Sequence, residues 1–408
     1  MLPPAADAVF AVNPRCEPGP YPADLAAVLS RRKAAEATAV ITSWAGHAET
    51  PLRALPALAA EIGVADVRYK DEGSRFGLGS FKALGGAYAV FRVLVRELER
   101  RSGRAVDTAA LALGELSAEV ADVTVTCATD GNHGRSVAWG ASLFGARCVV
   151  FVHSTVSEGR VAAIRAYGAE VIRTPGTYDD AVRAAAAAAA DNGWFIVSDT
   201  SWPGYTDVPR DVMQGYAVMV EEALAALGPD AAPTHVFVQG GVGGLAAAVV
   251  AHLWETLGPG RPKVVVVEPL TAACLLESAR LGRATAVDGD LATLMAGLAC
   301  GEPSLLAWKV LDRGADAFLA IPDAAAAAAL RLLASGRAGA TIVGGESGVA
   351  GLAGLTVLAG RPDWRAAIGL DAASRVLLFG SEGDSDPTLY TELVGRSGDA
   401  VRAAAFAG

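Results

Sequence analysis

The segment "VTVTCATDGNHGRSVAWGASLFGARCVVFVH" (residues 123–153) places two β-branched runs on either side of a helical stretch. The runs "VTVTCA" and "RCVVFVH" are short and rich in valine and threonine, which is typical of buried strands. The helix between them is too long for a hairpin connection, so the two strands are expected to pair in parallel. The segment therefore predicts an α/β fold.

The alternation of strands and helices continues along the chain, with further strands predicted at "EVIRT", "WFIVS", "HVFVQ", "KVVVVEP" and "SRVLLFG". We predict a small unit of residues 101–212 and a larger unit of residues 1–100 and 213–408. The first hundred residues contain little strand beyond "VRYKD", so they are assigned to the larger unit. The alanine tracts 184–190 and 324–329 are interpreted as helix rather than disorder, because alanine is the best helix former.

Charge and cysteine usage exclude several classes of protein. The net charge is −10 and the basic residues are scattered, which argues against a nucleic-acid partner. No uninterrupted apolar segment is long enough to span a membrane, so we expect a cytoplasmic protein without membrane contact. The five cysteines form no CxxC pair, which favours a reducing compartment, although a Cys274–Cys300 disulfide stays open.

The segment "QGGVGGL" (residues 239–245) follows a predicted strand and precedes a helix. Its glycines allow the backbone to approach an anion, and the helix start favours a phosphate group. The segment matches neither GxGxxG nor the Lys-Ser/Thr ending of a P-loop, which disfavours dinucleotides and nucleoside triphosphates. The competing interpretation is a flexible turn.

The segment "TDGNHGR" (residues 129–135) also lies between a strand and a helix, at the edge where open α/β sheets bind ligands. Asn132 and the amide of Gly131 offer donors there, and Asp130 adds an acid. The alternative is that Asp130 or Asn132 only caps the following helix. His133 is interpreted as a loop histidine, because no second ligand at metal-binding spacing accompanies it, and no metal site is predicted.

Two later strand ends carry polar groups. "FGSEGDSDP" (379–387) places Ser381 where the sheet ends, and "SDTSWPGYTDVP" (198–209) places Asp199 just beyond a strand. Taken alone, the first segment is better interpreted as a solvated acidic turn and the second as an ordinary loop.

Two lysines lie in "KDEGSRFGLGSFKALGGAYAV" (residues 70–90). Lys70 stands beside two acidic residues and is interpreted as an exposed lysine. Lys82 falls two residues after Ser80, which is predicted to cap a helix. A lysine in the first turn faces the positive end of the helix dipole, which favours its neutral, nucleophilic form.

Together, these features resemble the fold-type II pyridoxal-phosphate enzymes of the tryptophan synthase β/threonine dehydratase superfamily. Within that group, the chain is similar to the diaminopropionate ammonia-lyases, on "KDEGSRFGLGSFKALGGAYA", "ATDGNHGRSVAWGA", "SDTSWPGYTDVPRDVMQGY", "TLMAGLACGEPS", "GGESGVAGLAGL" and "GSEGDSDPTLY". The resemblance implies two open, twisted, mostly parallel sheets flanked by helices, with the active site between a large and a small domain.

The resemblance also implies roles for individual residues. Lys82 would form the Schiff base with pyridoxal phosphate, Asn132 would bind its phenolic oxygen, and Ser381 would face its pyridine nitrogen. Catalysis would involve Lys82, Asp130 and Asp199. Further cofactor contacts would come from Phe81, Gly240, Gly241, Val242, Gly243, Gly244 and Glu346, and substrate contacts from Thr129, Asp130, Gly131, His133 and Asp199.

The implied activity is a carbon–nitrogen lyase reaction, the α,β-elimination of 2,3-diaminopropionate to pyruvate and two ammonia molecules, by a homodimer. Two residues depart from the family pattern: Gly73 replaces a usual serine, and Gly79 a small polar residue such as asparagine. The main alternative is a serine/threonine dehydratase-like enzyme or another fold-type II β-eliminating enzyme. A non-catalytic binding protein of the same fold is a remote alternative.

Overall fold

The structure is a computed structural model that describes residues 7–129 and 131–407. The chain divides into two compact units. Unit 1 comprises Met1–Arg31, Glu49–Ser80 and Met219–Gly408, and unit 2 comprises Arg32–Ala48 and Phe81–Val218.

The bounds of the units differ from the predicted ones in three places. Residues 32–48, 81–100 and 213–218, which we predicted in the larger unit, belong to unit 2. The physical reason for the second difference is that helix α4 (Lys82–Ser102) packs along helix α7 (Asn132–Phe144). The contacts of α4 therefore lie with helices that follow it in the sequence, in unit 2.

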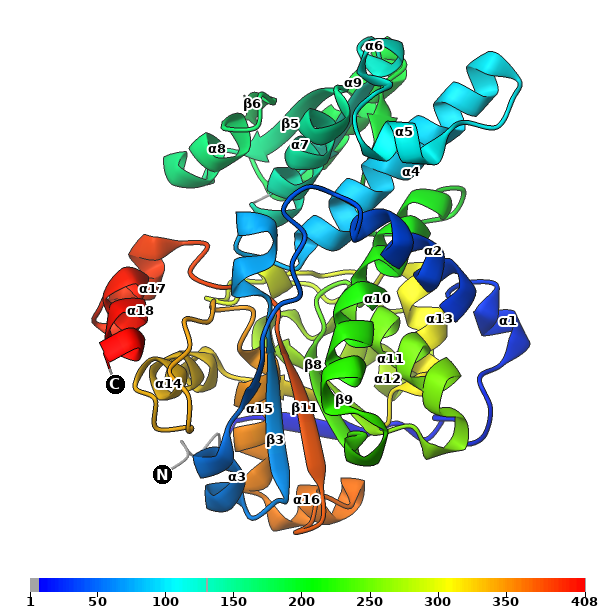
Figure 1. Cartoon of the computed structure of the whole chain (residues 1–408). Helices are drawn as coiled ribbons and strands as arrows, with labels where there is room; N and C mark the ends of the chain where they lie inside the picture. Colours follow the sequence, from blue (N-terminus) through cyan, green and yellow to red (C-terminus); the bar gives the residue numbers. More distant parts are fainter. Residues whose placement is uncertain (1–6, 130, 408) are drawn as a thin grey trace. The chain divides into compact units, whose positions relative to one another are not determined.

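In unit 1, the described residues form a seven-stranded sheet with the order β1-β10-β9-β8-β11-β3-β2. The five inner strands run parallel, and each edge strand is antiparallel to its neighbour. The strands are β1 (Val9–Val12), β2 (Leu52–Ala54), β3 (Asp66–Asp71), β8 (His235–Gln239), β9 (Lys263–Pro269), β10 (Ala317–Ile321) and β11 (Arg375–Gly380). Figure 1 shows β3 and β11 side by side, as their register requires.

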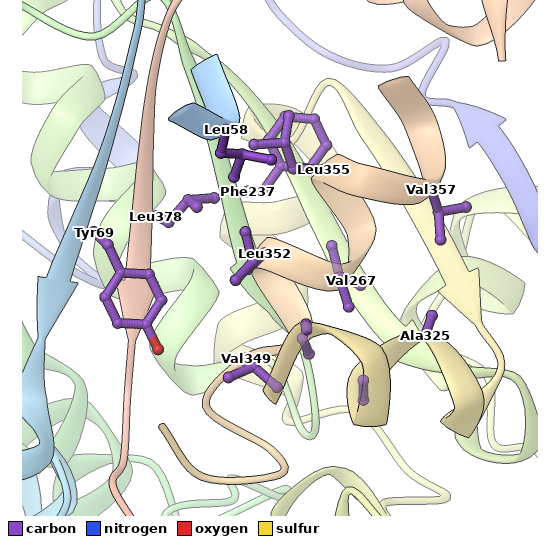
Figure 2. Close-up of a cluster of buried hydrophobic side chains, with 14 of the residues drawn as sticks. Leu58, Tyr69, Phe237, Val267, Ala325, Val349, Leu352, Leu355, Val357 and Leu378 are labelled. Atoms are coloured by element: carbon purple, nitrogen blue, oxygen red, sulfur yellow. The ribbon is translucent and has the colours of Figure 1, made fainter. Parts of the chain in front are cut away.

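The inner strands read as continuous apolar runs because both of their faces are covered. All five residues of β8 are buried, and helix α15 (Ala350–Ala359) packs against β8, β9 and β10. Figure 2 shows Leu352 and Leu355 of α15 among side chains of the sheet, including Phe237 and Val267. This core fixes the strand ends that carry the predicted cofactor residues.

The remaining helices of unit 1 surround this sheet. They are α1 (Ala23–Ala26), α3 (Pro56–Ile62), α11 (Gly244–Leu257), α12 (Cys274–Leu281), α13 (Leu305–Gly314), α14 (Asp323–Ala334), α16 (Pro362–Ile368), α17 (Pro387–Val394) and α18 (Gly398–Ala407). Two helices, α2 (Arg31–Ile41) and α10 (Asp207–Leu227), contain residues of both units.

In unit 2, the described residues form a four-stranded parallel sheet with the order β6-β5-β4-β7. Its strands are β4 (Thr124–Ala128), β5 (Arg147–His153), β6 (Glu170–Thr174) and β7 (Phe195–Ile196). Its other helices are α5 (Thr108–Ala112), α6 (Ser117–Val120), α8 (Glu158–Arg165) and α9 (Tyr178–Asn192). The predicted α/β class, with two mostly parallel sheets, is confirmed.

Both alanine tracts form helices, α9 and α14. Helix α9 begins with a capping box in which Thr177 and Asp180 each accept a hydrogen bond from the other's backbone N–H. Within the described ranges, no helix combines the length and apolarity that crossing a membrane requires.

Candidate active site

Helix α4 begins at Lys82, the lysine predicted to hold the cofactor. The prediction that Ser80 caps this helix is wrong, because Phe81 occupies the cap position and makes no side-chain cap hydrogen bond. Ser80 instead forms an isolated antiparallel bridge with Glu382. The backbone before α4 is thus held by pairing with the segment that follows β11.

The turn that leads to α4 requires left-handed backbone. Phe76, Gly77 and Gly79 have φ values of +50°, +70° and +69°. Glycine takes this conformation without cost and asparagine takes it more readily than other residues, which accounts for either residue at position 79. A Cβ on Gly73 would lie 3.2 Å from Asp71 Oδ1 and 3.3 Å from the Gly383 Cα. The left-handed backbone thus favours glycine at position 79, and the close approach of Asp71 and Gly383 favours a residue without a side chain at position 73.

The amine of Lys82 forms a very short ion pair with the carboxylate of Asp199. It lies 5.4 Å from the ring centre of Phe81 and 5.9 Å from that of Tyr216, and these two rings contact each other. A Cβ on Gly85 would lie 2.4 Å from the Tyr216 ring, so this glycine lets the ring approach α4 closely. Unit 2 therefore brings the predicted lysine and acid together.

Asp199 is held as a carboxylate. Burial raises its pKa, but the positive charge of Lys82 and the neighbouring His133 lower it further, so the pKa of Asp199 lies below its usual range. His133 Nδ1 lies 3.9 Å from Asp199 Oδ2, and its Nε2 lies 2.8 Å from the carbonyl oxygen of Val197. Because a carbonyl can only accept, Nε2 carries a proton and the ring is fixed beside the acid.

The segment between β4 and α7 is organised by Thr129. Its hydroxyl oxygen accepts hydrogen bonds from the N–H groups of Gly131 (3.0 Å) and Gly134 (3.1 Å). A Cβ on Gly134 would lie 2.2 Å from Thr129 Cγ2, so a side chain there would displace the threonine. Helix α7 begins at Asn132. Asp130 lies outside the described residues, and its role stays a prediction, as do the cofactor contact of Asn132 and the substrate contacts of Thr129, Gly131 and His133.

In unit 1, the segment predicted to be the phosphate cradle lies between β8 and α11, as the sequence predicts. Gly241 and Gly243 have φ values of +62° and +98°, and Gly243 occupies the cap position of α11 without any side chain. A Cβ on Gly243 would lie 3.0 Å from Leu311 Cδ1. Because helix starts commonly bind anions, the phosphate contact of these backbone groups stays a prediction.

A buried acid that no sequence pattern indicates packs against this segment. Glu268 of β9 is completely buried and accepts hydrogen bonds from the N–H groups of Leu275 and Leu276, both at 2.8 Å. A Cβ on Gly240 would lie 2.8 Å from Glu268 Cγ. Burial raises the pKa of Glu268, the two N–H groups lower it, and the result is a pKa of about 8.

Cys274 lies beside the same segment. It is a buried free thiol whose Sγ is 3.7 Å from the Gly241 carbonyl oxygen. The Cys274–Cys300 disulfide that the sequence leaves open is therefore not made in this structure.

Ser381 follows β11 and is buried, as is the predicted cofactor residue Glu346. The Ser381 hydroxyl contacts the side-chain amide of Gln239, the last residue of β8. Glu382, the next residue, accepts hydrogen bonds from the N–H groups of Ser347 and Gly348. The segment is thus bound into the sheet, and its interpretation from the local sequence as a solvated acidic turn is wrong.

Sequence reasoning missed Tyr216, Gln239 and Glu268. A signal existed for Gln239, because a polar residue ends an otherwise apolar strand directly before the glycines. No comparable local signal marks Tyr216, which reaches Lys82 from a helix more than a hundred residues away in the sequence.

The interpretation of Lys70 as an exposed lysine is wrong. Its side chain is 1 % exposed, and its amine donates to the Glu222 carboxylate (2.5 Å) and to the Thr50 carbonyl oxygen (2.7 Å). The acidic neighbours in sequence suggested a solvated surface, but β3 is an inner strand of the sheet.

Comparison with known proteins gives three concordant findings. The family described as "Pyridoxal-phosphate dependent enzyme" matches residues 44–379. The diaminopropionate ammonia-lyase of Salmonella typhimurium is 39% identical over 362 residues, which cover 86% of this chain and 89% of that protein.

Two solved structures from Escherichia coli are similar along their whole length. The holo form of diaminopropionate ammonia lyase has a TM-score of 0.88 at 35% identity, covering 97% of this chain and 98% of that one. The same enzyme in complex with an aminoacrylate-PLP azomethine reaction intermediate has a TM-score of 0.85 at 36% identity, covering 95% and 97%. This chain belongs to the family of pyridoxal-phosphate dependent enzymes, with the fold that its sequence predicts.

Proposed function

We propose that this chain is a diaminopropionate ammonia-lyase, which eliminates the β-amine of 2,3-diaminopropionate. The observation that carries the proposal is the contact between Lys82 and Asp199, which puts a carboxylate beside the reactive amine. The similarity to enzymes of that name over most of the chain supports it.

The residues present fit pyridoxal phosphate. Gly240, Gly241, Val242, Gly243 and Gly244 would hold the phosphate, because two of these glycines adopt left-handed backbone before a buried helix start. Ser381 would hold the pyridine nitrogen, Asn132 the phenolic oxygen, and Lys82 the carbonyl carbon. When bound, this cofactor supplies an electron sink for negative charge at the substrate Cα.

The chain's own groups would then move the protons. With the L isomer, the Lys82 amine removes the Cα proton as general base. With the D isomer, the Cα proton points to the opposite face, and Asp130 is the proposed base. The β-amine leaves as ammonia, and the released enamine hydrolyses to pyruvate and a second ammonia.

The positive charge of the substrate β-ammonium group would be attracted by the Asp199 carboxylate. A β-ammonium group about 4 Å from one carboxylate gains on the order of 4 kcal/mol at an effective dielectric constant near 20. Serine and threonine carry a hydroxyl at that position and gain no such energy. In the structure the charge of Lys82 lowers the pKa of Asp199 against the effect of burial, and a substrate β-ammonium group beside the carboxylate would favour its charged form in the same way.

The test is pyruvate release by the cofactor-loaded protein from L- and D-2,3-diaminopropionate, L-serine and L-threonine under the same conditions. We expect a higher kcat/KM for diaminopropionate than for either hydroxy amino acid. Faster release of pyruvate from serine, or of 2-oxobutyrate from threonine, would contradict the proposal and favour a dehydratase. No turnover of any of these substrates by loaded protein would favour a binding protein.

We also propose that the protein acts in the cytoplasm as a homodimer. The family resemblance supports the dimer, and the buried free thiols Cys127, Cys148 and Cys274 support a reducing compartment. Light scattering after gel filtration should give twice the mass of one chain. A single-chain mass at micromolar concentration would refute the dimer and leave the proposed reaction unaffected.

A further inference from the structure

The side-chain amide of Gln239 is a buried hydrogen-bond donor next to Ser381. It is 2 % exposed at the end of β8. Its Nε2 atom lies 2.5 Å from Ser381 Oγ, 2.9 Å from the Phe379 carbonyl oxygen and 3.3 Å from the Gly348 carbonyl oxygen. All four residues belong to unit 1.

The orientation of the Gln239 amide follows from these partners. Exchanging its nitrogen and oxygen would set Oε1 against two carbonyl oxygens, which only accept hydrogen bonds. The nitrogen therefore faces them, and Oε1 is buried with no hydrogen-bond partner in the described part of the chain. The cost of an unpaired buried acceptor therefore falls on Oε1, while the two N–H groups of Nε2 are shared among three acceptors.

This orientation decides what Ser381 can do. An amide nitrogen has no lone pair to offer, so the Ser381 oxygen accepts from Gln239 and its own O–H proton must point elsewhere. Ser381 is 3 % exposed, and no acceptor for that proton is found among the described residues. The O–H group of Ser381 is therefore available to donate a hydrogen bond to a bound ligand.

The charged and titratable groups around the pair do not supply that acceptor. The Glu382 carboxylate accepts from Ser347 N–H (2.9 Å), Gly348 N–H (3.2 Å) and the Ser385 hydroxyl (3.2 Å). On β3, Tyr69 packs against Gly380, but its hydroxyl oxygen makes no hydrogen bond with any described residue, Ser381 included. Glu346 is buried in the segment before α15.

We propose that Gln239 is a positioning residue that fixes the Ser381 hydroxyl as a hydrogen-bond donor to the pyridine nitrogen of the cofactor. The inference rests on the proposed role of Ser381. Only an unprotonated pyridine nitrogen can accept from a hydroxyl, because a protonated one is itself a donor. Gln239 thus favours the neutral ring without touching it.

The test is a double-mutant cycle between Gln239→Met and Ser381→Ala, read on the cofactor-loaded protein without substrate. The measurements are the dissociation constant for pyridoxal phosphate and the pH dependence of the visible absorbance. Each single variant should weaken cofactor binding roughly two- to tenfold, the range of one ordinary hydrogen bond. Each should also change the pH dependence in the same way, and the double variant should lose no more than the worse single one.

A purely structural role predicts a different result. If Gln239 only ties β8 to the end of β11, the losses multiply in the double variant, and Gln239→Met leaves the pH dependence unchanged. Either outcome overturns the proposal. Gln214→Met, at the other glutamine of the chain, removes a buried amide outside the predicted site and should leave the spectrum unchanged.

A second variant covers the case in which Gln239→Met fails to fold, which circular dichroism would reveal. Gln239→Glu keeps the shape and puts an acceptor beside Ser381, so the hydroxyl proton should turn toward residue 239. We expect the same spectral change as in Ser381→Ala, and a spectrum like that of the unmodified protein refutes the proposal. Because no diaminopropionate is present, coupling without later pyruvate release would refute the proposed function alone.

Discussion

At the scale of the residue, Lys82 is distinguished by its surroundings rather than by its sequence neighbours. Five features meet at its amine or along its backbone: the start of α4, the Asp199 carboxylate, the two aromatic rings and the left-handed turn before it. Lys70, only twelve residues earlier, is buried in a sheet and forms an ion pair with Glu222. The type of residue is the same, and the tertiary environment assigns the role.

Replacing Lys82 tests this assignment. Lys82→Ala should abolish the visible absorbance of the lysine-bound cofactor and lower kcat by at least roughly 10²-fold, since a general base is lost. Absorbance spectra and pyruvate release measure the two effects. Lys309→Ala, at an exposed lysine of α13, is the matched control and should change neither. An unaltered spectrum in Lys82→Ala would transfer the role to another lysine.

At the scale of the element, the strands and helices around the motifs could be predicted because their signals are local. Strand β8 has the predicted bounds, and β11 begins one residue later than predicted, at Arg375. The short edge strands β1 and β2 were not predicted, since three or four residues carry too little periodicity. The helix cap at Ser80 failed for a different reason, because pairing with Glu382 overrides the local preference of serine.

In the candidate site, too, only the residues with a local sequence signal could be predicted. Glycines and a lysine beside predicted strand ends indicate a ligand site, so the glycine segment 239–245 and Lys82 could be predicted from local sequence. Gln239 and Glu268 act through partners on other elements, 142 residues away for Ser381 and 7 or 8 for the N–H groups of α12. The Gln239–Ser381 contact depends on the tertiary structure. The Glu268 contacts are local, but no residue type marks them, because nearly every residue carries a backbone N–H.

The buried carboxyl group of Glu268 makes the stability of unit 1 depend on pH. The pKa of Glu268 rises from 4.5 to about 8 on folding, so between these values the folded chain holds a proton that the unfolded chain has lost. Stability therefore falls as the pH rises through this window and levels off above it. Burial also raises the pKa of the neighbouring Cys274, which stays a neutral thiol throughout.

Glu268→Gln should remove this dependence, because a glutamine carries no proton to lose. Urea midpoints measured from about pH 5 to about pH 8 should fall for the unmodified protein and fall less for the variant. The variant should be relatively most stable at the upper end of the range. Equal slopes for both proteins would show that Glu268 is ionised in the folded state.

At the scale of the whole molecule, four charges are buried together in unit 1. Lys70, Glu72, Arg75 and Glu222 are each at most 8 % exposed, and Thr50 joins them through its hydroxyl. Arg75 binds Glu72 at 2.8 and 2.9 Å and Glu222 at 2.6 and 2.8 Å. The two positive and two negative charges balance, which is the condition under which buried ions are tolerated. The cluster joins β3, the turn before Lys82 and the end of α10 that belongs to unit 1.

Breaking the balance should therefore be costly. Arg75→Met leaves one negative charge uncompensated and should destabilise unit 1 by about 3–5 kcal/mol. Arg402→Met, which removes an exposed partner of Asp384, is the matched control and should cost about 0–1 kcal/mol. Urea unfolding followed by circular dichroism compares the two midpoints. The double variant Arg75→Met/Glu222→Gln restores neutrality and should recover part of the loss, whereas a further fall in the midpoint would show that individual hydrogen bonds, and not net charge, hold the cluster.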